Sequence, residues 1–268
     1  MSRRLVALLL LITSIASHTC AVADDAPPPP LVFESESFAY RITLPDAWVR
    51  IPRTSLAMMT KNTLKQQAAG TVVFDAGFQS SADAPWFTHP YALIQIMSYD
   101  NLGSPEQPMD RDLDDVVSAL TGVDIDKEFS RAARDEVREA VLNVSRAQNV
   151  HFDRTRRRFA FEFELTVADV GVIHARSTGI FGRNVLALMH FYAPKETWTT
   201  HEPTAQLLAD AFAFNPDSAY DETRASSTPL SALRRFAPGP SAGGVLLAIV
   251  ALVMLRKRRR RERLSPGA

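Results

Sequence analysis

FAFEFEL, residues 159–165, is the stretch that decides the fold, because large apolar residues alternate there with alanine or glutamate. An alternation of period two places one set of side chains on each face of a strand, so we expect one buried and one solvent-facing side. Asp169 and the run Gly182-Arg183-Asn184 are turn residues. They divide the surrounding sequence into three predicted antiparallel strands, residues 152–167, 171–181 and 184–192.

The rest of the body supplies further strands and several helices. Apolar alternation and turn residues predict strands over residues 31–44, 48–51, 71–78 and 91–99. Helical spacing and capping residues predict helices over residues 55–69 and 112–120, a helix that begins at Ser130, and a last helix over residues 199–214 that buries Leu207 and Leu208. Strands therefore come in runs with helices between the runs. This order predicts an α+β fold, an antiparallel sheet with helices packed on its faces.

Two stretches of the body resemble the family of Mog1 and PsbP-like domains. The first is FAYRITLPDAW, residues 38–48, an extended strand that enters a Pro-Asp-x-Trp turn. The second is the closing unit, in which strand 184–192 leads to Trp198, a helix and the run Phe212-Ala-Phe-Asn-Pro216. The resemblance covers about residues 31–220. It implies an αβα sandwich with a role in binding or assembly, and no shared catalytic residues.

The C-terminal part of the chain has the pattern of a membrane anchor. Residues 236–255 contain no charged residue, and seven of the next eight residues are basic. Pro238 and Pro240 cannot sit inside a regular helix, so we expect a single transmembrane helix over residues 241–255. The basic tail, residues 256–268, is expected in the cytoplasm, where positively charged flanks are retained. The body then lies outside the inner membrane.

Other interpretations of the tail remain open. Gly243-Gly244, the apolar run and the arginine cluster together resemble sorting signals of the GlyGly-CTERM type, whose tail is cleaved by an intramembrane protease before the protein moves to the cell surface. Surface release after cleavage is therefore an alternative to a plain anchor. A buried core helix with a solvated basic tail and nucleic-acid binding by the arginine run are two further alternatives.

The N-terminus has the three parts of a secretory signal. Arg3 and Arg4 form the positive region, an apolar run follows, and Ala21-Val22-Ala23 is a small-residue cleavage site, so we expect removal of residues 1–23. An uncleaved anchor and a lipoprotein signal that uses Cys20 are the alternatives. Cys20 is the one cysteine of the chain. Its removal with the signal would exclude disulfides, thiol nucleophiles and cysteine metal sites from the mature protein.

Together these segments predict the order of the whole chain. The proline-containing linker covers residues 24–30, the extracytoplasmic domain residues 31–220 and a polar, proline-containing tether residues 221–240. Nine of the 30 basic residues but only one of the 30 acidic residues lie in the two terminal signals. The body between them carries 21 basic and 29 acidic groups, a net charge of about −8, and this charge excludes nucleic acid as its partner.

The sequence offers few candidates for a site. Its histidines form no His-x-His or His-x-x-x-His pair, no phosphate-binding glycine loop is present, and we predict no cofactor, no metal and no catalytic residue. The arginine-containing run 154–158 is expected to be a solvated strand entry or a contact for acidic partners or lipid headgroups. The best binding candidate is the loop that holds Trp86, Phe87 and His89, although the interpretation that the two aromatic residues cover the core is the preferred one.

We therefore predict a membrane-anchored, non-enzymatic binding or scaffold protein of the bacterial envelope. It would have a single span, an unknown envelope protein as its partner, and a body in the periplasm or at the surface. The alternative is an envelope hydrolase or transferase whose site is built from scattered residues near His151, Asp153 and Ser177.

Overall fold

The main sheet has eight strands in the order β3-β4-β5-β10-β9-β8-β6, with β7 also paired to β8, and every pairing is antiparallel. The computed structural model describes residues 30–63, 74–81, 89–99, 106–122, 124–133 and 135–224. The strands are β3 (Val49–Arg50), β4 (Phe74–Gln79), β5 (Tyr91–Ser98), β6 (Val141–Val144), β7 (Gln148–Asp153), β8 (Arg158–Val167), β9 (Gly171–Phe181) and β10 (Val185–Pro194). A second sheet of order β1-β2-β11 joins β1 (Val32–Ser35), β2 (Tyr40–Thr43) and β11 (Phe212–Phe214).

The alternation at residues 159–165 produces the predicted two-faced strand. Phe159, Phe161, Phe163 and Leu165 are all buried, while Glu162 and Glu164 on the opposite face are partly exposed. Strand β8 pairs with β9 along its whole length, from Arg158 opposite Ile180 to Val167 opposite Gly171. The buried side of this long hairpin faces one of the two hydrophobic cores.

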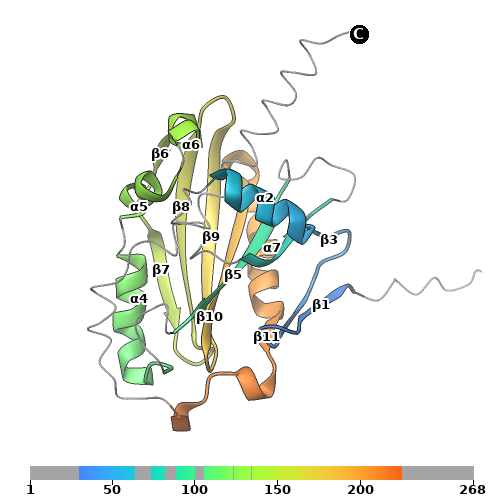
Figure 1. Ribbon diagram of the computed structural model, residues 1–268, viewed down its shortest axis with the longest axis vertical. Coiled ribbons are helices and arrows are strands. Elements are labelled where there is room, and N and C mark those ends of the chain that lie inside the picture. Colours follow the sequence, from blue (N-terminus) through green and yellow to red (C-terminus); the bar gives the residue numbers. More distant parts are fainter. Residues whose placement is uncertain are drawn as a thin grey trace, which may run out of the picture. The chain divides into compact units, whose positions relative to one another are not determined.

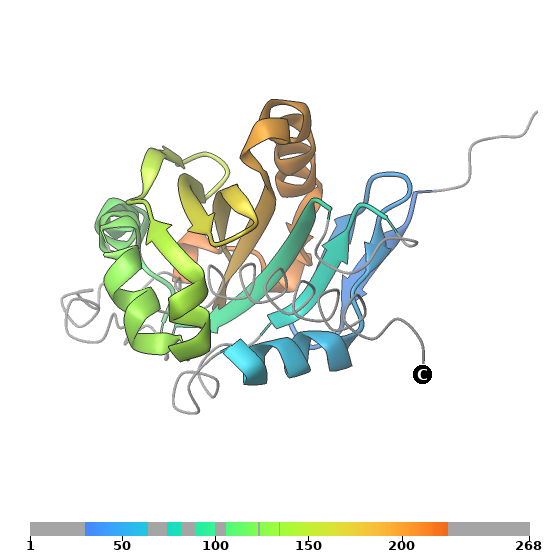
Figure 2. The same cartoon turned by 90° about the horizontal axis from the view of Figure 1, so that it is seen from above.

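A hydrophobic core lies on each side of the main sheet. One core includes buried residues from α2 (Arg53–Thr63), α4 (Leu113–Thr121) and α5 (Ile125–Ala132). The other core is closed by α7 (Trp198–Ala211) and the small sheet. Figure 2 shows α7 on one side of the main sheet and α2 on the other. This α+β arrangement of layers, an antiparallel sheet with helices on its faces, is the predicted fold class (Figure 1).

Two predicted strands are in fact hairpins. The segment 31–44 turns after β1 and returns as β2, with Ala39 at a φ of 49°. The segment 152–167 turns through residues 154–157, with Arg157 at a φ of 51°. Neither turn contains glycine or proline, the residues that most often mark a turn in a sequence.

Each predicted helix overlaps an observed helix, but the predicted boundaries differ from the observed ones. Ser130 does not begin a helix, since it lies inside α5, whose N-cap is Asp124; the Asp124 side chain accepts a hydrogen bond from the Lys127 backbone N–H at 3.1 Å. The short α6 (Asp135–Ala140) and strand β6 follow it. Helix α7 ends at Ala211, where β11 begins, and Leu207 is 53% exposed whereas Leu208 is fully buried.

The predicted terminal segments lie outside the part of the chain that the structure describes. These are the signal with Cys20, the transmembrane segment 241–255 and the basic tail 256–268. Among the described helices, none combines the length and the apolar character that a membrane span needs.

Candidate binding site at one end of the main sheet

Two turns of the main sheet bring five arginines to the same end. Arg158 lies opposite Ile180, and the Phe181 backbone N–H donates to the Arg157 carbonyl at 3.0 Å. The β7–β8 turn, residues 154–157, and the β9–β10 turn, residues 182–184, therefore lie next to each other. They place Arg154, Arg156, Arg157, Arg158 and Arg183 together. We call this region the arginine end of the sheet.

The arginines of the β7–β8 turn and the start of β8 reach carboxylates on several different elements. Arg154 pairs with Asp114 on α4, and Arg157 pairs with Glu222 and, at 3.2 Å, with Asp110. Arg156 and Arg158 both bind Asp210 near the end of α7, at 3.3 and 3.2 Å. The arginine run 154–158 is thus partnered by carboxylates of its own chain. Each exposed pair of this kind contributes only about 0–1 kcal/mol to stability.

A C-terminal segment, residues 215–224, crosses the arginine end, and we call it the strap. It contains two short 3₁₀ helices, η4 (Pro216–Ser218) and η5 (Glu222–Arg224). Ala219 pairs with Gly182, and the Arg183 backbone N–H donates to the Ser218 carbonyl at 2.8 Å. The strap is therefore bonded to the β9–β10 turn in the manner of a short extra strand.

A buried glutamine and a tyrosine fix the second half of the strap. The side-chain amide of Gln107 donates to the Asp221 carbonyl and accepts from the Asp221 backbone N–H, at 3.2 Å in the second case. The Tyr220 hydroxyl donates to the Pro108 carbonyl, and the Arg157 guanidinium lies 5.3 Å from the Tyr220 ring centroid. Residues 221–224, which the sequence analysis assigned to the tether, are therefore held against the domain.

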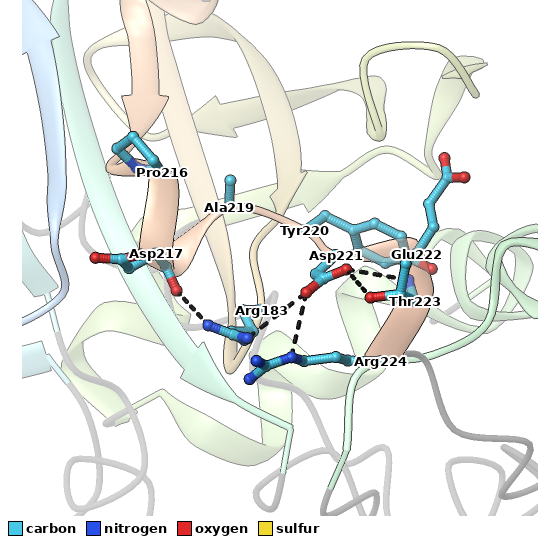
Figure 3. Close-up of a pocket in the computed structure, with 9 residues that line it drawn as sticks. All are labelled: Arg183, Pro216, Asp217, Ala219, Tyr220, Asp221, Glu222, Thr223 and Arg224. Carbon is cyan, nitrogen blue, oxygen red and sulfur yellow. Dashed lines mark hydrogen bonds and ion pairs between the residues drawn. The ribbon is translucent and has the colours of Figure 1, made fainter.

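The strap and Arg183 enclose an open cavity of about 570 Å³. Its lining is Arg183, Pro216, Asp217, Ala219, Tyr220, Asp221, Glu222, Thr223 and Arg224 (Figure 3). In Figure 3 the Arg183 side chain reaches between the two halves of the strap. One Arg183 nitrogen donates to the Asp217 carbonyl at 2.9 Å, and another lies 3.6 Å from the Asp221 carboxylate.

The Asp221 carboxylate is the central acceptor of the cavity. Its Oδ1 accepts from the Thr223 hydroxyl at 2.6 Å and from the Thr223 backbone N–H at 3.0 Å. Its Oδ2 lies 3.4 Å from the Arg224 Nε. These two hydrogen bonds, with the nearby guanidiniums of Arg183 and Arg224, lower the pKa of Asp221, so the group is ionised at neutral pH.

The described residues that flank the predicted aromatic loop lie at the opposite end of the main sheet. Ser98 of β5 pairs with Val185 beside the arginine end, whereas Tyr91, where the loop ends, pairs with Tyr192 at the far end of β10. His89 is an exposed bend residue. Trp86 and Phe87 lie outside the described residues, so their role stays a prediction.

The three scattered residues of the enzymatic alternative do not meet. Ser177 is fully buried in β9, and its hydroxyl lies 2.7 Å from Nδ1 of His190 on β10. His151 is exposed on β7, and the Asp153 carboxylate accepts from the Arg156 backbone N–H at 3.0 Å within the β7–β8 turn.

His190 joins Ser177 to Gln95 in a row across three strands. The His190 Nε2 lies 3.4 Å from the Gln95 Oε1, and all three side chains have 0% exposure. Burial lowers the pKa of His190 to about 3, so the imidazole is neutral. We call Ser177, His190 and Gln95 the buried polar row. A neutral ring accepts from the Ser177 hydroxyl at Nδ1 and donates from Nε2 to Gln95.

A further histidine lies between two carboxylates under the start of α7. His174 is 3.5 Å from both Glu162 and Glu164, and its ring centroid lies 4.0 Å from that of Trp198. Lys195 donates to Glu164 at 2.9 Å. Within the described ranges, no group of three or more histidine, cysteine, aspartate or glutamate side chains is placed to hold a metal ion.

Two solved structures are similar to this chain. The chain is similar to cyanobacterial PsbP (CyanoP) from Synechocystis, with 15% identity, a TM-score of 0.40, and coverage of 69% of this chain and 92% of that one. It is also similar to LpqN, involved in cell envelope biogenesis of Mycobacterium tuberculosis, with 11% identity, a TM-score of 0.33, and coverage of 71% and 88%. The first of these structures is a PsbP protein, the family named in the predicted resemblance, and the likeness stays a resemblance. No protein-family model and no curated protein matches the chain.

Sequence reasoning missed the cavity because the strap has the polar composition of a linker. One signal was available, namely Tyr220, an aromatic residue within an otherwise polar stretch. A tyrosine in such a position often packs its ring against the domain and bonds through its hydroxyl, as Tyr220 does here.

Proposed function

We propose that this chain is a non-enzymatic binding or scaffold protein of the bacterial envelope, anchored in the inner membrane with its PsbP-like domain outside the cytoplasm. The N-terminal signal pattern, the uncharged segment 236–255 and the basic cluster after it support this location. Cleavage of the tail and release to the surface is the alternative fate. The partner is an envelope protein, and the surface of this chain that binds it includes the cavity at the arginine end.

The observation that carries the proposal is the cavity beneath the strap. It has a volume within the range of small-molecule and side-chain pockets, and convergent charged groups line it. Its walls are held in place by the Gln107 and Gly182 bonds to the strap, so the site is preformed.

Site-specific photo-crosslinking in intact cells tests this proposal. A crosslinking amino acid replaces Pro216, which lines the cavity, in the full chain. The matched control carries it at Met58, which is 59% exposed on α2. We expect a discrete protein adduct from position 216 that is lost when Arg183→Glu is added. Equal adducts from both positions would contradict the cavity as the binding surface, and an adduct from position 89 alone would move the site to the aromatic loop.

The topology is tested separately from the binding surface. We expect a reporter fused to the C-terminus to stay on the cytoplasmic side while a protease added to spheroplasts digests the domain. Recovery of the intact full-length chain from the cytosol would contradict the envelope location. A mature protein that ends before residue 264 would favour cleavage and surface release.

A hydrolase is the second candidate, favoured by the 2.7 Å contact between the Ser177 hydroxyl and His190. A serine bonded to an imidazole is the pair that a nucleophile and its base form. Because both side chains have 0% exposure, we expect a fluorophosphonate probe not to label Ser177 in the folded full chain. Labelling that is abolished by Ser177→Ala would support the hydrolase instead.

A further inference from the structure

Two arginines and one carboxylate meet at the centre of the cavity. The guanidiniums of Arg183 and Arg224 both approach one carboxylate, that of Asp221. In Figure 3 the side chains of Asp217 and Glu222 point away from this group, and Glu222 pairs with Arg157 outside it. Two guanidiniums thus share the Asp221 carboxylate, while the other two carboxylates that line the cavity, those of Asp217 and Glu222, are turned away from them.

The two arginines differ in how firmly they are held. The Arg183 side chain is 22% exposed and is bound to both the Asp217 carbonyl and the Asp221 carboxylate. The Arg224 side chain is 67% exposed and approaches Asp221 through its Nε. The two terminal nitrogens of Arg224 have no partner among the residues that the structure describes. Such a guanidinium fork matches the geometry of a carboxylate or a phosphate.

We infer that the cavity binds the acid group of an anionic ligand, a carboxylate or a phosphate, between the terminal nitrogens of Arg224 and the fixed guanidinium of Arg183. The inference rests on the proposed function and names the chemistry that the partner presents to the cavity. Asp221 acts as an internal competitor that holds both arginines when no ligand is bound. The acidic body, with its net charge of about −8, keeps anions weakly bound elsewhere, so the site depends on local geometry.

Arginine-detected NMR on the full chain in dodecyl maltoside micelles measures this binding. The probes are inorganic phosphate and acetate, added at constant ionic strength because exposed charges are screened by salt. We expect saturable shifts of the Arg183 and Arg224 side-chain N–H signals and none at Arg138. Arg138 is a matched control, because its pair with Asp135 has the same i,i+3 spacing, a 3.6 Å separation and a 47% exposed guanidinium.

Two substitutions are expected to move the affinity in opposite directions. Arg224→Gln removes the fork and weakens phosphate binding by about tenfold. Asp221→Asn removes the competitor but keeps the backbone bonds to Gln107, and it tightens binding by about fivefold. The controls Arg138→Gln and Asp135→Asn leave the affinity unchanged. Shifts that grow linearly and equally at Arg138, or an affinity that Asp221→Asn does not raise, would overturn the inference.

The same signals in nanodiscs that contain phosphatidylglycerol identify the source of the anion. If lipid headgroups fill the cavity, the Arg224 signal is already shifted there and no longer responds to phosphate. If the ligand is a soluble acid group, the signal responds as it does in micelles. Loss of the position-216 crosslink in Arg183→Glu together with no anion response would refute this inference and leave the proposed function standing. A position-216 crosslink that Arg183→Glu does not remove, together with no anion response, would refute both.

Discussion

The buried polar row and the arginine end handle polarity in opposite ways. In the buried row, Ser177, His190 and Gln95 are uncharged, have no exposure, and are joined across neighbouring strands of the main sheet. At the arginine end, the polar groups are charged and partly or fully exposed, and they join different elements. The register of the sheet fixes the positions of the buried polar row. The arginine end is instead joined by charged side chains that can change partner.

This contrast separates stability from binding. A buried polar group must keep its hydrogen bonds, because losing one leaves the partner unsatisfied in a dry core. An exposed ion pair loses little when it opens, since water replaces the partner. We therefore expect substitutions in the buried row to change the free energy of unfolding and substitutions at the cavity to change binding.

The largest effect is expected from His190→Ala. The substitution removes a fully buried ring and leaves the Ser177 hydroxyl and the Gln95 carbonyl without their partner. Cavity formation and lost hydrogen bonds together should reduce the free energy of unfolding by about 3–5 kcal/mol. Urea denaturation measures the loss, and the control His89→Ala, at an exposed position, should stay within about 0.5 kcal/mol of the wild type.

Acid pH should give the next largest effect through the same ring. The folded pKa of His190 is lowered to about 3, below the unfolded value of about 6.5, so the unfolded state takes up the proton first. Its contribution is complete above pH 6.5 and falls by about 1.4 kcal/mol for each pH unit below it, until about pH 3.

The test is a comparison of unfolding free energies between pH 6.5 and pH 5. The wild type should lose about 2 kcal/mol more than His190→Gln, which has no proton to take up at this position. An identical slope in both proteins would show that folding does not lower the pKa of His190, so the ring takes up its proton in the folded state as readily as in the unfolded state. The buried polar row would then hold a charge in acid, and it would no longer differ from the arginine end in being uncharged.

The smallest effect is expected from Asp210→Asn at the arginine end. Asp210 binds both Arg156 and Arg158, but its side chain is 44% exposed. We expect a loss below about 1 kcal/mol at low salt that disappears near 1 M salt, because screening removes the interaction. A loss above about 2 kcal/mol that persists in salt would mean that the arginine end contributes to the free energy of unfolding as much as the buried polar row does.

The sequence predicted the parts of the fold that follow from short-range periodicity. The alternation at residues 159–165 and the turn around Gly182-Arg183-Asn184 gave β8, β9 and β10 almost at their observed positions. The turns at residues 36–39 and 154–157 were missed, because neither contains the glycine or proline that usually marks a turn. A backbone conformation with positive φ at alanine or arginine has no signature in residue type.

The buried row could have been found from the predicted turn. A tight hairpin centred between Arg183 and Asn184 places residue 177 opposite residue 190, and this is the observed register. The prediction instead grouped Ser177 with His151, a histidine on β7 that lies opposite Ala160 and not opposite Ser177. The cavity could not be found in this way, since it depends on where a polar segment folds back after the last helix. The contact of this segment with the domain leaves no periodic pattern of apolar residues in the sequence.

The pinned strap also decides how the domain responds to a mechanical load. A pull on the chain beyond Arg224 is resisted by the ion pair of Arg157 with Glu222, by the paired bonds of Gln107 with Asp221 and by the bridge between Gly182 and Ala219. Strand β11 and helix α7 lie behind these bonds and are shielded while they hold. Tension along the C-terminus would therefore enter at the stiff hairpin of β9 and β10, the part of the sheet with the longest ladders, and the small sheet would not be peeled away first.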